Sequence, residues 1–154
     1  MKVRTIQRGI LLFWALYFLL VWITNLCDAL KELGWLGKDW RYVSGNYALI
    51  VEVTAGKVGG PAWLAPVLFA GVLLWEAAAG VMFIRAAAVF RSMTQPGRQT
   101  VHAAFAAALG LWAAFILADE FFIDYRFETT HRSLLTLQLL SLLAMHLLRD
   151  DASG

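Results

Sequence analysis

Four long hydrophobic stretches divide this chain, and they constrain its fold more than any other feature. They cover about residues 10–29, 62–84, 101–118 and 133–148. An α-helix rises about 1.5 Å per residue, so roughly 20 residues cross the ~30 Å hydrocarbon layer of a bilayer. The fourth stretch is short and needs snorkelling flanks or a locally thinner membrane. We predict one all-α transmembrane domain over residues 1–154, a four-helix bundle that runs up-down-up-down.

The composition agrees with a membrane location. Of the 154 residues, 60% are hydrophobic and only 16% are charged, whereas soluble domains are nearer half apolar and a quarter charged. The net charge of +2 is too small, and too dispersed, for nucleic-acid binding. We therefore expect the lipid bilayer, with other membrane subunits or further copies of this chain, as partners, and no nucleic acid.

The basic residues favour one orientation. An even number of spans places both termini on one side. The basic residues of that side sit in short segments beside the helix ends, where charge bias acts most strongly on orientation. We predict that both termini are cytoplasmic. The terminal side carries Lys2, Arg4, Arg8, Arg85, Arg91, Arg98 and Arg149, and the other side carries Lys31, Lys38, Arg41, Lys57, Arg126 and Arg132.

The connections differ in character. Residues 85–100 form a short basic loop with a Pro96-Gly97 turn signal. Residues 30–61 form a longer outer loop that contains "NYALIVEV", which is apolar but too short to span the membrane. This segment suits an interfacial or re-entrant position, or a cover over the outer mouth of the bundle.

One carboxylate lies within the second stretch, in "GVLLWEAAAGVMF". Glu76 facing lipid would cost on the order of 2.5 kcal/mol or more, so we expect it to face the bundle interior or to carry a proton. Counting along each span from its centre places Tyr17 and Ser141 at a similar depth and Gln138 about a turn further out. Glu76 is either hydrogen-bonded to one of these three, as a structural group, or part of a proton or substrate site, or in contact with a partner subunit.

Acidic residues gather at the outer ends of the spans. Carboxylate and amide oxygens with one histidine form a set that could hold a divalent cation. The alternative is an ordinary polar boundary, with Arg126 and Arg132 neutralising the acids. The residues of this outer-face cluster are Asn25, Asp28, Asp119, Glu120, Asp124 and His131, with Glu128 nearby.

Two histidines permit a test for haem. His102 begins the third span and His146 lies about one turn from the end of the fourth, both towards the cytoplasm. Two facing helical histidines can ligate a b-type haem axially, which keeps a redox subunit among the possible functions. The alternative is a pair of interfacial histidines.

Alanine and glycine recur at three- and four-residue spacing in "AAAGVMFIRAAA" and "HAAFAAALGLWAA". Small residues let helices approach closely in lipid. We therefore predict that the second and third spans form the tightest helix pair.

The order of these motifs resembles a bacterial family of predicted small integral membrane proteins, domain of unknown function 2165. The likeness rests on Asn-x-x-Asp at the end of the first span (Asn25, Asp28), on "NYALIVEV", on Glu76, and on Glu120 followed by two aromatic residues. The segment "DYRFETTHRS" differs from the family's stretch before the fourth span. The resemblance implies a four-helix protein of the bacterial inner membrane with Asn25, Asp28, Glu76 and Glu120 as its distinctive polar residues.

No nucleophile with its base and no phosphate-binding glycine loop occurs in the chain, so we predict no catalytic residues. The leading hypothesis is an accessory or scaffolding subunit of a membrane complex. The alternative is a small proton- or cation-coupled transporter or channel that uses Glu76, and the third is a haem-binding redox subunit.

Overall fold

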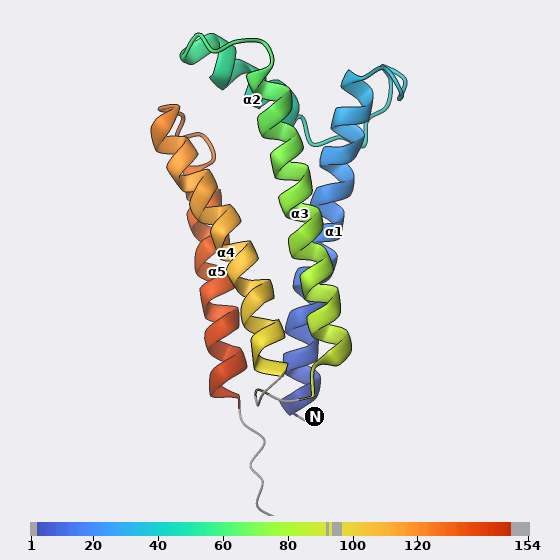
Figure 1. The fold of residues 1–154 in the computed structure, drawn as a ribbon, viewed down its shortest axis with the longest axis vertical. Helices are drawn as coiled ribbons and strands as arrows, with labels where there is room; N and C mark the ends of the chain where they lie inside the picture. Colours follow the sequence, from blue (N-terminus) through green and yellow to red (C-terminus); the bar gives the residue numbers. More distant parts are fainter. Residues whose placement is uncertain (1–2, 92, 94–96, 149–154) are drawn as a thin grey trace, which may run out of the picture.

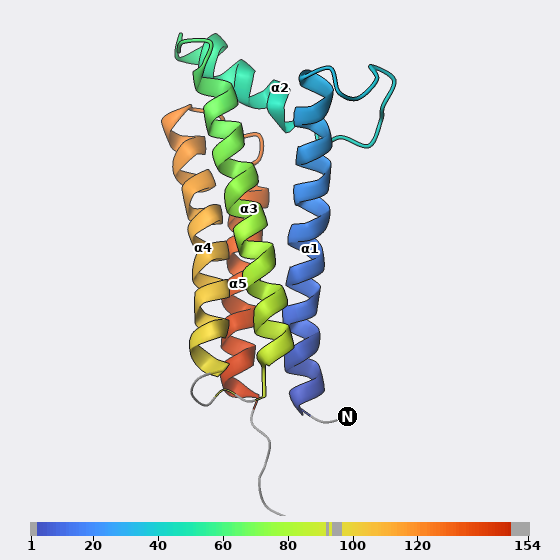
Figure 2. The ribbon, with the colours of Figure 1, turned by 45° about the vertical axis from the view of Figure 1, so that its right-hand side comes forward.

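Helices account for the fold. The computed structural model describes residues 3–91, 93 and 97–148. Its elements are α1 (Val3–Glu32), α2 (Asn46–Val51), the π-helix η1 (Glu52–Lys57), α3 (Leu64–Val89), α4 (Gly97–Phe121) and α5 (Glu128–Leu147), and no strand occurs in these residues. The predicted all-α class is confirmed. The long helices lie side by side, with α2 across one end (Figures 1 and 2).

Three of the helices support a membrane protein. By length and composition, α1, α3 and α4 are long and apolar enough to cross a bilayer. Among the helices of the described residues, α5 does not meet this standard, because His131, Arg132, Gln138 and His146 lower its mean hydropathy.

The helices are longer than the hydrophobic stretches that predict them. α3 continues to Val89 through Ala86 and Ala87, so the first part of the expected 85–100 loop is helical. Alanine is the best helix former, and Arg85 disturbs a helix little. Lys2, Pro96 and Arg149, which enter the predictions of orientation and of the loop, lie outside the described residues.

The two ends of the molecule differ. α1 begins and α5 ends at the same end, which we name the terminal end (Figure 1). α2, η1 and the connection between α4 and α5 lie at the opposite end, which we name the outer end (Figure 2). The outer end therefore collects the polar segments between the helices.

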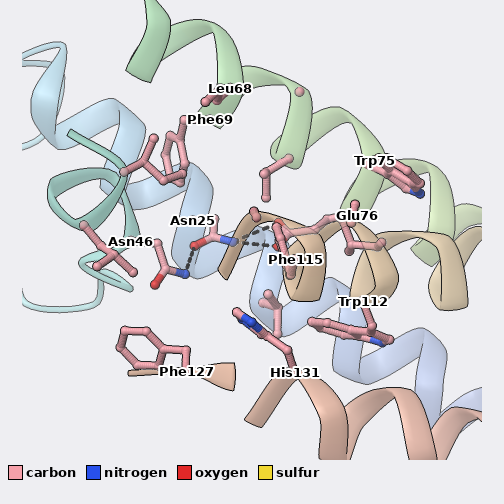
Figure 3. Close-up of a pocket in the computed structure, with 18 of the residues that line it drawn as sticks. Asn25, Asn46, Leu68, Phe69, Trp75, Glu76, Trp112, Phe115, Phe127 and His131 are labelled. Carbon is pink, nitrogen blue, oxygen red and sulfur yellow. Dashed lines mark hydrogen bonds between the residues drawn. The ribbon is translucent and has the colours of Figure 1, made fainter. Parts of the chain in front are cut away.

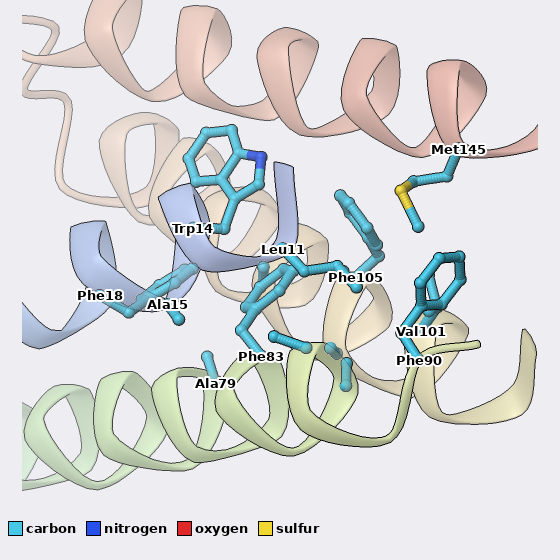
Figure 4. Close-up of a cluster of buried hydrophobic side chains, with 14 of the residues drawn as sticks. Leu11, Trp14, Ala15, Phe18, Ala79, Phe83, Phe90, Val101, Phe105 and Met145 are labelled. Carbon is cyan, nitrogen blue, oxygen red and sulfur yellow. The ribbon is translucent and has the colours of Figure 1, made fainter. Parts of the chain in front are cut away.

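The core lies nearer the terminal end. α1 buries residues at three- and four-residue spacing, among them Leu11, Trp14 and Phe18. The ring of Phe18 stacks on that of Phe83, with centroids 5.9 Å apart, and Phe83 meets Phe105 edge to face at 5.1 Å. Figure 4 shows these side chains filling the space between the helices. The packed rings close this half of the molecule.

The tightest helix pair differs from the prediction. α3 packs most extensively against α1, and only then against α4. Its small residues face α1: a Cβ added at Gly80 would meet Phe18 Cβ at 3.5 Å, and Ala79 is fully buried in the same core. The spacing correctly identifies a close-packing face, but it does not say which neighbour uses that face.

Candidate functional site

The buried stripe of α1 changes from apolar to polar towards the outer end. Asn25 lies about two turns after Phe18, and Glu76 lies about two turns before Phe83, so the antiparallel pairing of α1 with α3 brings Asn25 and Glu76 together. Asn25 Nδ2 donates to both carboxylate oxygens of Glu76, at 2.7 and 2.9 Å. Glu76 is only 2% exposed.

A second amide fixes the orientation of the first. Asn46, the first residue of α2, donates from Nδ2 to Asn25 Oδ1 at 2.9 Å. Since the Asn25 carbonyl oxygen is occupied, its NH₂ group must face Glu76. Figure 3 shows the resulting chain from α2 through α1 to α3.

Asp28 holds the start of α2. Its Oδ2 accepts from the backbone N–H of Tyr47 at 2.9 Å and from Ser44 Oγ at 3.0 Å. The first turn of a helix has unpaired N–H groups, so a carboxylate from a neighbouring helix acts here as a cap. Gly45 supplies the left-handed backbone (φ 77°) that turns the chain into α2. Asp28 therefore positions Asn46.

The other wall of the site carries an acid–histidine pair. His131 Nδ1, near the start of α5, lies 2.7 Å from Asp119 Oδ2, near the end of α4. The ring of Phe115 lies against the His131 ring, with centroids 5.0 Å apart. This pair joins the outer halves of α4 and α5.

Ion pairs tie η1 to the connection between α4 and α5. Lys57 Nζ lies 3.0 Å from Asp124 Oδ2, and Arg126 bridges Asp124 and Glu52, reaching Glu52 Oε1 at 3.0 Å. We name these four residues the outer latch. The hydrogen bonds from the Arg126 guanidinium hold the pKa of Asp124 well below its usual range, and those bonds raise the pKa of Arg126. The outer latch therefore links η1, which precedes α3 in the chain, to the connection that precedes α5.

A cavity of about 640 Å³ lies beneath this cover, between the outer halves of the long helices. Binding sites for small molecules commonly have this size and combine apolar walls with a few polar groups. Its walls are largely aliphatic and aromatic, and Figure 3 shows several of the rings. Its polar lining residues are Tyr17, Thr24, Asn25, Asn46, Glu76, Asp119, Asp124, Thr130 and His131.

The structure corrects the predicted hydrogen-bond partner of Glu76, which is Asn25 and not Tyr17, Ser141 or Gln138. Tyr17 lines the same cavity, but Glu76 accepts its hydrogen bonds from Asn25. Ser141 Oγ accepts from Trp14 Nε1 at 3.0 Å. Gln138 is fully buried, and its amide atoms have no hydrogen-bond partner among the described residues. Counting from span centres gives depth along each helix but not which side chains face each other, and so it does not identify Asn25 as the partner of Glu76.

The outer-face cluster separates into distinct contacts. Asn25 joins Glu76, Asp28 caps α2, Asp119 pairs with His131, and Asp124 belongs to the outer latch. Glu120 accepts from Tyr125 Oη at 3.3 Å, and its negative charge raises the pKa of Tyr125. In the described part of the chain, no three His, Cys, Asp or Glu side chains gather as a metal site.

The two helical histidines meet at the terminal end. His102 Nε2 lies 3.0 Å from His146 Nε2, and His146 Nδ1 lies 2.9 Å from Leu142 O. Haem iron with both axial ligands holds its histidines on opposite faces of the macrocycle, whereas these rings touch directly. This arrangement does not fit a haem between them.

Several residues of the site are absent from the residues predicted. In the sequence Asn46 only opens an apolar segment, and Glu52 and Lys57 are two charges among several in the connection over residues 30–61. Trp75 and Trp112 also line the cavity, and nothing in the sequence distinguishes them from the other tryptophans of the chain. A polar residue opening a short helix beside an Asn-x-x-Asp pattern was the one usable signal.

Comparison with known proteins adds no identification: no family model, no curated protein and no solved structure matches this chain.

Proposed function

We propose that this chain is a multi-pass membrane protein that binds a small, largely apolar molecule in the cavity at its outer end. Four spans, α1, α3, α4 and α5, run up-down-up-down through the bacterial inner membrane, with both termini in the cytoplasm. The observation that carries the proposal is the cavity itself. Its volume is typical of sites for small molecules, and its wall contains one deeply buried carboxylate, Glu76, which accepts hydrogen bonds from the amide of Asn25.

Binding suits the arrangement better than a continuous channel. The packed rings of Phe18, Phe83 and Phe105 fill the bundle between the cavity and the terminal end. A molecule that reaches Glu76 therefore meets a closed floor. Transport would require the helices to move apart, whereas binding requires only that the cavity fill.

Filling the cavity tests the proposal. Ala114 lines it, whereas its neighbour Ala113 is exposed on the outside of α4. In a thermal-shift screen of small molecules in mild detergent, a bound molecule should raise the unfolding temperature of the wild type and of Ala113→Phe. Ala114→Phe should lose that response, since its ring occupies the cavity. At about 100 times Kd a ligand stabilises by about 2.7 kcal/mol.

The proposal fails if both folded phenylalanine variants respond alike to every molecule that shifts the wild type, or if none shifts it. Mass spectrometry of molecules that co-purify with the wild type and not with Ala114→Phe provides a second readout.

The second candidate, an accessory subunit of a larger complex, draws support from α5. This helix is the least apolar of the long four, and the polar residues Arg132, Ser133, Thr136 and His146 are exposed on it. A polar-containing span is more stable against another protein than against lipid. Purification from native membranes as a monomer, with no co-purifying protein, would contradict this candidate. An absorbance spectrum of the same sample tests the haem hypothesis.

A further inference from the structure

We infer that the molecule bound in this cavity is a lipophilic organic cation, such as a quaternary ammonium or phosphonium ion or a protonated amine. The inference rests on the proposed function and names the chemical class that the cavity selects. It follows from the charges that line the cavity, from their partners and from the aromatic walls.

The charge of the lining is one-sided. Glu76, Asp119 and Asp124 line the cavity, and among the described residues no lysine or arginine does. Asp119 is paired with His131, and Asp124 is paired with Lys57 and Arg126. An anionic molecule would therefore meet acidic groups, and the one basic side chain among the described lining residues, His131, is already paired with Asp119.

Glu76 differs from the two aspartates. In the part of the chain that the structure describes, none of the ion pairs involves it, and its hydrogen bonds come from the neutral amide of Asn25. A buried carboxylate without a counter-ion is costly, and a cation beside it offsets much of that cost. The cavity thus offers one acidic position for a cation to occupy.

The walls suit an organic cation better than a metal ion. Tyr17, Trp75 and Trp112 line the cavity with Glu76, and both tryptophans are labelled around it in Figure 3. Aromatic faces attract cations, most strongly when the cation is weakly hydrated. Ca²⁺ instead needs six to eight oxygen ligands around one point, and among the described residues no three acidic or histidine side chains gather in this way.

Two ions of the same shape and opposite charge separate charge from size. Tetraphenylphosphonium and tetraphenylborate should both be measured by equilibrium dialysis against detergent-solubilised protein, with the signal of Ala114→Phe subtracted to remove uptake by micelles. We expect saturable binding of tetraphenylphosphonium to the wild type and none of tetraphenylborate. This comparison needs no change to Glu76.

Substitution of the acid provides the second arm. Glu76→Gln retains an oxygen that can accept from Asn25 but removes the charge, and it should weaken tetraphenylphosphonium binding by about tenfold or more. Glu32→Gln is the matched control, because Glu32 is exposed at the end of α1, outside the cavity. This variant should bind as the wild type does. Thermal unfolding of each variant verifies its fold.

The outcomes distinguish the two proposals. If tetraphenylborate binds as tightly as tetraphenylphosphonium, or if folded Glu76→Gln binds the cation unchanged, the inferred class is wrong. If other molecules still distinguish Ala114→Phe from Ala113→Phe, the proposed function stands without it. If no molecule distinguishes the two alanine variants, both proposals fall.

Discussion

At the scale of single residues, most buried polar side chains of the bundle have hydrogen-bond partners, whereas among the described residues the indole N–H of Trp112 and the amide of Gln138 have none. Asn25 uses its whole amide, accepting from Asn46 and donating to Glu76. The indole N–H of Trp14 donates a hydrogen bond to Ser141 Oγ. Gln138 is fully buried and leaves two polar atoms without a partner in the described residues, against one in Trp112, so its amide is the larger cost on the α4–α5 side.

Gln138→Leu should therefore stabilise the protein. A buried amide without hydrogen bonds costs about 1–3 kcal/mol, and leucine has a similar volume. We expect the unfolding temperature in mild detergent to rise by about 2–4 °C. Ser141→Ala should lower it, because this change leaves Trp14 Nε1 unpaired. A lower unfolding temperature for Gln138→Leu would contradict this prediction, because it would show that the amide stabilises the fold.

The residue scale also shows the limit of prediction from the sequence. The burial of Glu76 followed from the cost of exposing a carboxylate to lipid, and the structure confirms it. Its partner did not follow, because partner choice depends on the register of α1 against α3. The stacking of Phe18 on Phe83 sets that register, and no single stretch of sequence reveals which rings meet.

At the scale of elements, short segments at the outer end are held by long helices. Asp28 caps α2, Tyr47 packs edge to face on Phe69 at 5.4 Å, and the outer latch holds η1. The sequence predicts "NYALIVEV" as a possible cover, but the contacts that hold η1, from Glu52 to Arg126 and from Lys57 to Asp124, reach the connection between α4 and α5. Loop-to-loop pairing leaves no periodic signal in a sequence, so the latch could not be foreseen.

The outer latch gives the protein a defined response to acid. Because the folded state lowers the pKa of Asp124, the carboxylate stabilises the fold fully above its unfolded pKa of about 3.9. That stabilisation is lost as the pH falls below this value towards the folded pKa. Asp124→Asn should lower the unfolding temperature at pH 7, and its difference from the wild type should shrink below about pH 4.

Thermal unfolding from pH 7 to pH 3 measures this difference, with Asp39→Asn, a change at an exposed loop residue, as the control. A gap between Asp124→Asn and the wild type that stays constant with pH would show that the latch does not act through this charge.

At the scale of the whole molecule, the proposed four-span topology makes α5 the decisive helix. α1, α3 and α4 have the length and composition of spans, and they follow the hydrophobic stretches that the sequence shows. α5 is equally continuous but more polar. Whether α5 crosses the bilayer therefore depends on its packing against other helices. It packs mainly against α4 and much less against α1.

Single cysteines test that topology. Cys27 is the only native cysteine, so Cys27→Ser gives a clean background. A membrane-impermeant maleimide applied to intact bacterial cells, with the outer membrane made permeable, should label Lys38→Cys and Arg132→Cys. Arg91→Cys and Leu147→Cys should react only after the inner membrane is opened. Equal labelling at 132 and 147 would mean that α5 does not cross.

The hydrogen-bonded chain from Asn46 through Asn25 to Glu76 has a consequence in terms of linkage. A molecule that changes how Glu76 is bonded must also change how firmly α2 is seated, because the same amide serves both. Coupling free energies are reciprocal. Suppose that an antibody binds α2 from outside and changes the affinity of the cavity for the proposed ligand by some factor. The ligand must then change the affinity of the antibody for α2 by the same factor. α2 is therefore a second site through which binding in the cavity can be regulated.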